Sequence, residues 1–105
     1  MSDSHGIALK RREDGSFALK GTLSFKTVTA LRNQGIDLFN ASEALVIDLA
    51  DIKRSDSAGV ALLIEWMRFA QSQGKSISYL NTPSQMLAIV RASSLDSILP
   101  LSRSE

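Results

Sequence analysis

The run of residues 44–49, ALVIDL, constrains the fold of this chain more than any other part of its sequence. It is almost continuously apolar and β-branched at its centre, which is typical of a buried central strand. The pattern after it predicts a loop over residues 51–55, a long helix over about 57–73 and a second strand over 76–80. Strands joined through a helix need a right-handed crossover within one sheet. We therefore expect an α/β fold with a mixed, mostly parallel β-sheet covered by helices.

Two more elements are predicted before this unit. Turn-forming residues 13–16 separate two stretches in which apolar and polar residues alternate, so we expect a β-hairpin. The alternating apolar residues are Ile7, Leu9, Phe17 and Leu19. Apolar residues at helical spacing predict a helix over residues 27–39, although Gly35 inside it costs about 1 kcal/mol relative to alanine.

A capping signal marks the start of the last helix. Thr82 is expected to be the N-cap, Pro83 the first helical residue, and Gln85 the residue that completes a capping box. The helix should run to about Ala92, and a short apolar segment should then close the domain. The apolar residues of that segment are Leu95, Ile98, Leu99 and Pro100. The predicted order of elements is β-β-α-β-α-β-α.

Length and composition are those of one soluble domain. The 105 residues, 44% hydrophobic and 22% charged, suit a single domain over 1–105 with a core over about 6–101. The net charge of +1 is scattered, which argues against direct binding to nucleic acid or to an anionic membrane. The sequence has no cysteine and no apolar secretory signal, and its longest apolar run, residues 58–64, is far shorter than the roughly 20 residues of a spanning helix. We therefore expect a cytoplasmic protein.

Ser57 falls at the start of the long predicted helix. A serine hydroxyl there can cap the helix by accepting a hydrogen bond from an unpaired backbone N–H. The same exposed N–H groups and the positive end of the helix dipole also tolerate an anion such as a phosphoryl group. Asp56 is an equally good cap, and would leave Ser57 exposed.

The long helix carries two apolar stripes. One stripe accounts for contact with the sheet and consists of Val60, Leu63, Ile64 and Met67. The second lies nearly opposite and consists of Leu62, Trp66 and Phe69. It meets either a neighbouring helix or a partner protein. If it meets a partner, Trp66 is an exposed anchor, and Trp66→Asp should weaken binding without unfolding the domain.

An enzymatic function is not expected. The single histidine, His5, lies near the N-terminus and leaves a nucleophilic serine without a good candidate base. Asp48, Asp51 and Asp56 fall near one strand end, but solvation and capping explain them better than Mg²⁺ binding does. Nucleotide binding is the weakest alternative, because Gly59 alone is not a phosphate-binding loop. We expect a non-catalytic interaction module without a catalytic residue, metal or cofactor.

The segment over residues 46–60, with Asp56-Ser57-Ala58-Gly59 at its helix start, resembles the STAS domain family, which includes anti-anti-sigma factors. The resemblance covers nearly the whole chain and implies the STAS fold, with helices packed on one face of the sheet. In the anti-anti-sigma branch the serine or threonine after this aspartate is the phosphoacceptor, a role that would fall to Ser57. Ala58 departs from the Ser-Ser form common in that branch and leaves the acceptor position intact.

Residues 61–66, 70–74 and 95–100 are similar, more narrowly, to the small cytoplasmic STAS subunit of Mla-type phospholipid ABC transporters. This resemblance implies a subunit that binds and regulates or stabilises the transporter ATPase, meets the membrane only through the complex with the permease, and serves outer-membrane lipid asymmetry. The partner-binding residues would be Asp56, Ser57, Ala58, Gly59, Leu62, Trp66 and Phe69. The alternative is an anti-sigma factor antagonist, whose partner is an anti-sigma factor kinase that phosphorylates Ser57.

Overall fold

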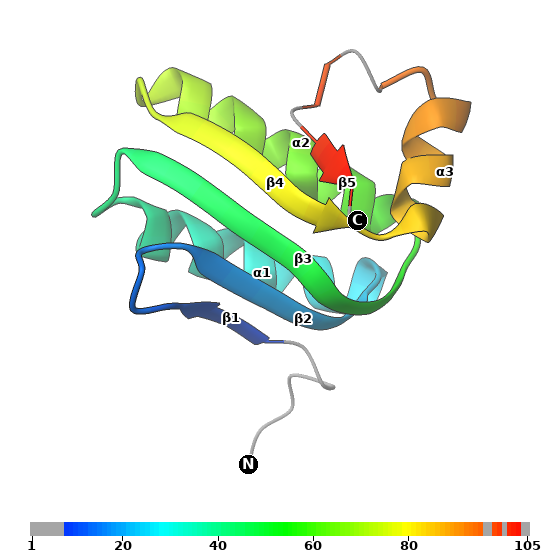
Figure 1. Cartoon of the computed structure of the whole chain (residues 1–105), viewed down its shortest axis with the longest axis horizontal. Helices are drawn as coiled ribbons and strands as arrows, with labels where there is room; N and C mark the ends of the chain where they lie inside the picture. The colour runs from blue at the N-terminus through cyan, green and yellow to red at the C-terminus, as the bar shows by residue number, and fades with distance from the viewer. Residues whose placement is uncertain (1–7, 96–97, 100, 104–105) are drawn as a thin grey trace.

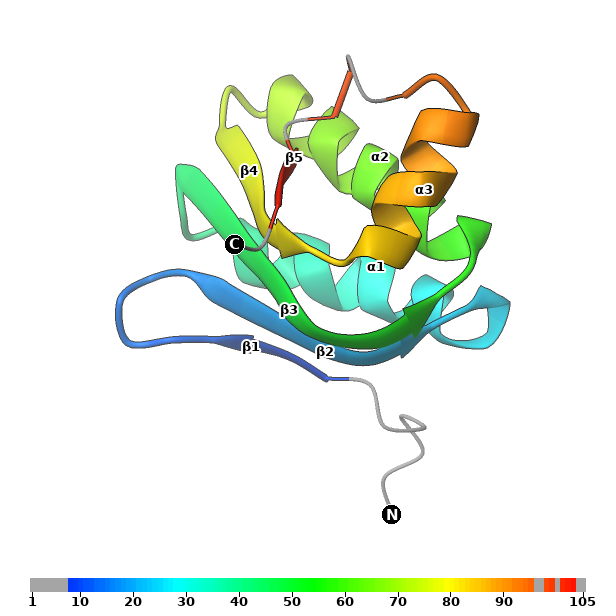
Figure 2. The same cartoon turned by 45° about the vertical axis from the view of Figure 1, so that its right-hand side comes forward.

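Five strands and three helices are present in the part of the chain that this computed structural model describes, residues 8–95, 98–99 and 101–103. The sheet has the order β1 (Ala8–Arg11), β2 (Phe17–Leu23), β3 (Ala44–Ser55), β4 (Ser76–Thr82), β5 (Leu101–Arg103). The helices α1 (Phe25–Phe39), α2 (Ser57–Ser72) and α3 (Ser84–Ala92) lie on one face of it (Figures 1 and 2). β1 runs antiparallel to β2, and every other neighbouring pair is parallel. The expected α/β fold with a mixed, mostly parallel sheet is confirmed.

The core lies between the central strands and the helices. Alternate residues of a strand point to the same face, and on the helix-covered face Phe17 of β2 pairs in register with Ile47 of β3. Both side chains are buried, as is Tyr79 of β4. The Tyr79 hydroxyl donates a 2.6 Å hydrogen bond to the backbone carbonyl of Leu63 in α2, and burial raises the pKa of this phenol well above 10. This contact ties α2 directly to the sheet.

β3 is longer than the sequence pattern predicts. Residues 51–55, expected as a loop, continue the strand to Ser55, because β2 runs alongside them with Lys20 opposite Asp51 and Leu23 opposite Ser55. The register shifts twice along this pairing, which breaks the alternation that would have marked a strand. The short strand β5 was not predicted either. The expectations for Ile7, His5 and Pro100 lie outside the described residues, and within those described no helix is long and apolar enough to cross a membrane.

The predicted cap of the last helix is wrong in its details. β4 continues through Thr82, which pairs with Arg103 of β5, so that the N-cap is Pro83 and α3 begins at Ser84. No side chain caps this helix. The Gln85 side chain, expected to complete a capping box, bonds instead to a different element, as described below. The helix itself and its end at Ala92 are confirmed.

α1 and α2 pack directly against each other through a glycine and a tryptophan. Trp66 of α2 is fully buried, its ring meets that of Phe39 edge-on at a centroid distance of 5.1 Å, and its Nε1 donates to the Arg32 carbonyl at 3.4 Å. A Cβ at Gly35 would lie 2.6 Å from the Trp66 ring. Gly35 is therefore present in the middle of a helix because only glycine lets the indole approach the α1 backbone so closely.

We expect Gly35→Ala to destabilise the protein, although alanine is the better helix former by about 1 kcal/mol. The added methyl group overpacks the contact with Trp66, and overpacking typically costs about 1–3 kcal/mol. Urea unfolding followed by circular dichroism measures the free energy of unfolding. The matched control is the same change in a Trp66→Phe background, where the smaller ring should make alanine neutral or favourable. A stabilising Gly35→Ala in the wild-type background would contradict the prediction.

The partly buried carboxylate of Asp48 links three strands on the open face of the sheet. Arg12, just after β1, donates to Asp48 Oδ2 at 2.9 Å, while Asn81 of β4 and the backbone N–H of Ala50 donate to Oδ1 at 3.0 and 2.9 Å. Burial raises the pKa of the Asp48 carboxyl, but the hydrogen bonds from Asn81, Ala50 and Arg12, with the Arg12 charge, outweigh burial and hold the pKa below 3.8. Asn81 adopts a left-handed conformation, φ 57°, at the strand position from which it makes this bond.

The Asp48 interaction should make stability depend on pH. Because the pKa is lower in the folded than in the unfolded protein, the carboxylate stabilises the fold above the unfolded pKa, and this contribution is lost as pH falls through the folded pKa. Asp48→Asn should lower the thermal midpoint at neutral pH, by a margin that narrows as the solution is acidified to about pH 3. Thermal melts across this range measure it, with Asp37→Asn, an exposed position on α1, as control. If the difference in thermal midpoint between the wild type and Asp48→Asn did not change with pH, the lowered pKa of Asp48 would be contradicted.

Candidate partner-binding site

The first turns of α1 and α2 begin side by side at one edge of the sheet (Figure 2). β2 and β3 are parallel, so both end at this edge, and each continues almost at once into a helix. Ser24 caps α1, with its side chain accepting from the Lys26 N–H, and Asp56 caps α2. The Asp56 N–H donates to the Leu23 carbonyl at 3.2 Å, which joins the two helix starts. We call the residues from Leu23 to Phe25 and from Ser55 to Ala58 the helix-start edge.

Ser57 is the exposed first residue of α2. The two caps considered from the sequence are now distinguished, because Asp56 Oδ1 accepts from the Ala58 N–H at 2.8 Å. Within the described part of the chain the Ser57 hydroxyl makes no hydrogen bond. It is therefore available at the positive end of the α2 dipole, where a group that carries negative charge is favoured.

Gly59 holds the edge together from beneath. It is buried, and a Cβ there would collide with Ser55 Oγ and lie 2.9 Å from the Leu23 Cβ. Any side chain at this position would push α2 away from the end of β2. Gly59 was expected to contact a partner; within the chain it is buried, and the close approach of Ser55 and Leu23 makes it a spacer between the two helix starts.

α3 supports the same edge through Gln85. The Gln85 Oε1 accepts a 3.0 Å hydrogen bond from the backbone N–H of Ser55, the last residue of β3. The buried Ser55 hydroxyl in turn donates to the Asp56 carbonyl at 3.0 Å. The sequence could not show the Gln85 contact, because it joins residues far apart in the chain, and the capping pattern suggested a local role.

Removing the Gln85 acceptor should destabilise the protein. Gln85→Met keeps the side-chain length but leaves the Ser55 N–H unpaired, which costs about 1–3 kcal/mol and lowers the thermal midpoint by about 4 °C or more in a domain of this size. Gln85→Glu retains an acceptor and should stay close to the wild type. Gln71→Met, at an exposed position of α2, is the matched control. A midpoint that Gln85→Met leaves unchanged would show that water replaces the bond.

The second apolar stripe of α2 is mostly core. Leu62 is 3% and Trp66 0% exposed, while Phe69 is half-buried. The expectation that Trp66 is an exposed anchor is wrong, because α1 covers this side of α2 at Gly35. Trp66→Asp would place a carboxylate in the core and is not a surface substitution.

Of the expected partner-binding residues, Asp56 and Ser57 are exposed and Ala58 is half-buried. The sequence analysis missed Phe25, the first residue of α1, whose side chain is 84% exposed. A local signal was available for it. Ser24 and Thr27 form a capping box that places the helix start at Phe25, earlier than the predicted start at Thr27.

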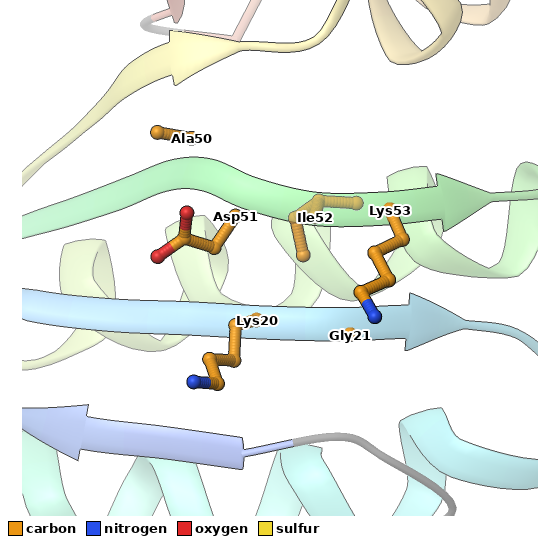
Figure 3. Close-up of a pocket in the computed structure, with 6 residues that line it drawn as sticks. All are labelled: Lys20, Gly21, Ala50, Asp51, Ile52 and Lys53. Carbon is orange, nitrogen blue, oxygen red and sulfur yellow. The ribbon is translucent and has the colours of Figure 1, made fainter.

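The three aspartates that fall near one strand end do not form a cluster. Asp48 is bound to Arg12, Asp56 caps α2, and Asp51 lines a shallow hollow of about 460 Å³ over β2 and β3. Figure 3 shows that the charged ends of Lys20 and Lys53 point to separate parts of this hollow. Among the residues that the structure describes, no group of carboxylates and histidines is placed to hold a metal ion.

A family model described as "Mlab, STAS domain" matches residues 9–100. No curated protein matches the chain. Among solved structures, one chain of the Acinetobacter MlaFEDB complex in an ATP-bound conformation is 21% identical, with a TM-score of 0.79 and coverage of 91% of this chain and 100% of that one. The anti-sigma factor antagonist SpoIIAA in its unphosphorylated form is 16% identical, with a TM-score of 0.73 and coverage of 94% and 88%. An anti-sigma factor antagonist from Mycobacterium paratuberculosis is 17% identical, with a TM-score of 0.69 and coverage of 98% and 90%.

Proposed function

This chain belongs to the STAS domain family, and from that premise we propose that it is the small subunit that binds the ATPase of an Mla-type phospholipid ABC transporter. It regulates or stabilises that ATPase, works in the cytoplasm, and meets the membrane only through the complex with the permease. The observation that carries the proposal is the family model described as Mlab, which extends over residues 9–100. The fold shared with a chain of the Acinetobacter MlaFEDB complex, which is covered over its whole length, supports it.

A non-catalytic role fits both the family and the site. STAS domains are in general regulatory domains or subunits rather than enzymes. Ser57 is exposed, but the neighbouring side chains have structural roles: Asp56 caps α2, and the Gln85 amide accepts from the Ser55 N–H. Neither is placed as a general base for Ser57. What the edge offers is a rigid surface with a hydroxyl at a helix start. We propose that Ser57, with Asp56 and Ala58 beside it, faces the ATPase.

The second candidate function is that of an anti-sigma factor antagonist that an anti-sigma factor kinase switches by phosphorylating Ser57. One observation favours it: Asp56 caps α2, so the Ser57 hydroxyl is exposed and not engaged within the described residues. The fold shared with SpoIIAA is compatible with it. Affinity purification from the native organism, followed by mass spectrometry, separates the two, because recovery of a transporter ATPase or of an anti-sigma kinase names the partner.

We expect Ser57→Asp to weaken binding to the ATPase at least tenfold without loss of stability. Because Asp56 already caps the helix, the new carboxylate is not needed for folding. It must, however, lose its hydration when the partner binds, which weakens the complex. Ser57→Ala should bind more nearly like the wild type. Calorimetric titration of the purified ATPase measures the affinities, with Ser76→Asp, at an exposed position at the start of β4, as control. Equal affinity for all variants would remove Ser57 from the interface.

A further inference from the structure

A groove of about 360 Å³ lies between the first halves of α1 and α2, beside Ser57. Val28 of α1 and Leu62 of α2 line it. Ala58 and Ala61, also on α2, have side chains too small to fill it. Most of its surface is apolar. Because Ala58 belongs to both the groove and the helix-start edge, the groove continues the surface that we propose for the ATPase.

Phe25 stands at the mouth of this groove. Its 84% exposure exceeds that of the other large apolar side chains on the described surface, 54% for Ile98 and 38% for Leu80. The Ser24 capping box fixes Phe25 at the first position of α1, so this exposure follows from a defined backbone. Exposed aromatic side chains beside an apolar pocket are typical anchors of protein interfaces.

Opposite charges stand on the two walls. Arg32 lies on the α1 wall and Glu65 on the α2 wall, and both are exposed. Within residues 8–95, 98–99 and 101–103 neither side chain makes a salt bridge or a hydrogen bond. An occupant that pairs both must present a carboxylate to α1 and a cation to α2. A lipid acyl chain would fill the apolar floor but leave both charges unpaired, whereas a protein segment can satisfy all of these groups.

We propose that the groove receives an apolar side chain from a segment of the partner ATPase, with Phe25 as the anchor and with Arg32 and Glu65 setting the orientation of that segment. This inference rests on the proposed function and adds to it the place and the chemistry of the contact. It also moves the anchor from Trp66, which is core, to the opposite wall on α1.

The test titrates the purified ATPase, and in parallel the anti-sigma kinase, against the full chain and matched variants. Phe25→Ser should weaken binding about thirtyfold, as the loss of a hot-spot residue does. Its control, Ile98→Ser, removes exposed apolar surface elsewhere and should bind like the wild type. Arg32→Glu and Glu65→Arg should each weaken binding about fivefold or more. Lys10→Glu, the same charge change at an exposed position on β1, is the control for Arg32→Glu. Circular dichroism checks that each variant is folded.

The outcomes separate the two claims. If the wild type binds the ATPase and Phe25→Ser binds it equally well, or if Ile98→Ser weakens binding as much as Phe25→Ser does, the groove assignment alone is overturned. Charge variants that bind like the wild type overturn the orientation assigned to the segment. A wild-type chain that binds the kinase but not the ATPase, or that binds neither protein, overturns the proposed function, and the groove assignment with it.

Discussion

The parallel pairing of β2 with β3 is the constraint on which the rest of the structure depends. β3 follows β2 as far as Ser55, opposite Leu23, and both strands therefore end at the same edge. Each strand passes into a helix after a single capping residue, Ser24 or Asp56. Had β3 ended at Leu49, a flexible loop would precede α2, and Ser57 would not be held at a defined place next to α1.

Two glycines then determine how close the helices come. Gly59 lets the start of α2 lie against Leu23, and Gly35 lets Trp66 lie against the backbone of α1. Both are buried inside helices, where glycine is unfavourable on propensity alone. Their contribution is steric: without a Cβ they allow close packing. We infer that this packing outweighs the cost of placing glycine in a helix. The apolar groove beside Phe25 lies between α1 and α2, on the N-terminal side of their contact at Gly35 and Trp66.

The chemistry of the site follows from the choice of Asp56 as the cap. A serine cap would consume the hydroxyl in a local hydrogen bond, whereas an aspartate cap leaves the next residue exposed at the positive end of the helix dipole. A charge added at Ser57 would then lie next to Ala58, which lines the apolar groove. Docking and a phosphate switch could therefore use the same surface, since desolvation of the added charge would oppose the partner.

The sequence by itself determined most elements and the place of Ser57. Strand and helix periodicities are local, so residues 44–49, the two long helices and the hairpin could be read directly. It also showed that α2 has two apolar stripes, but not what covers the second. That depends on Gly35, on a different helix, so only the tertiary structure decided that Trp66 is core and that Phe25 is the exposed aromatic. The same reason explains Gln85 and the end of β3. The Gln85 side chain could have capped its own helix, but it bonds to a strand far away in the chain. The last residues of β3 lack clear alternation, and they are a strand because distant β2 pairs with them.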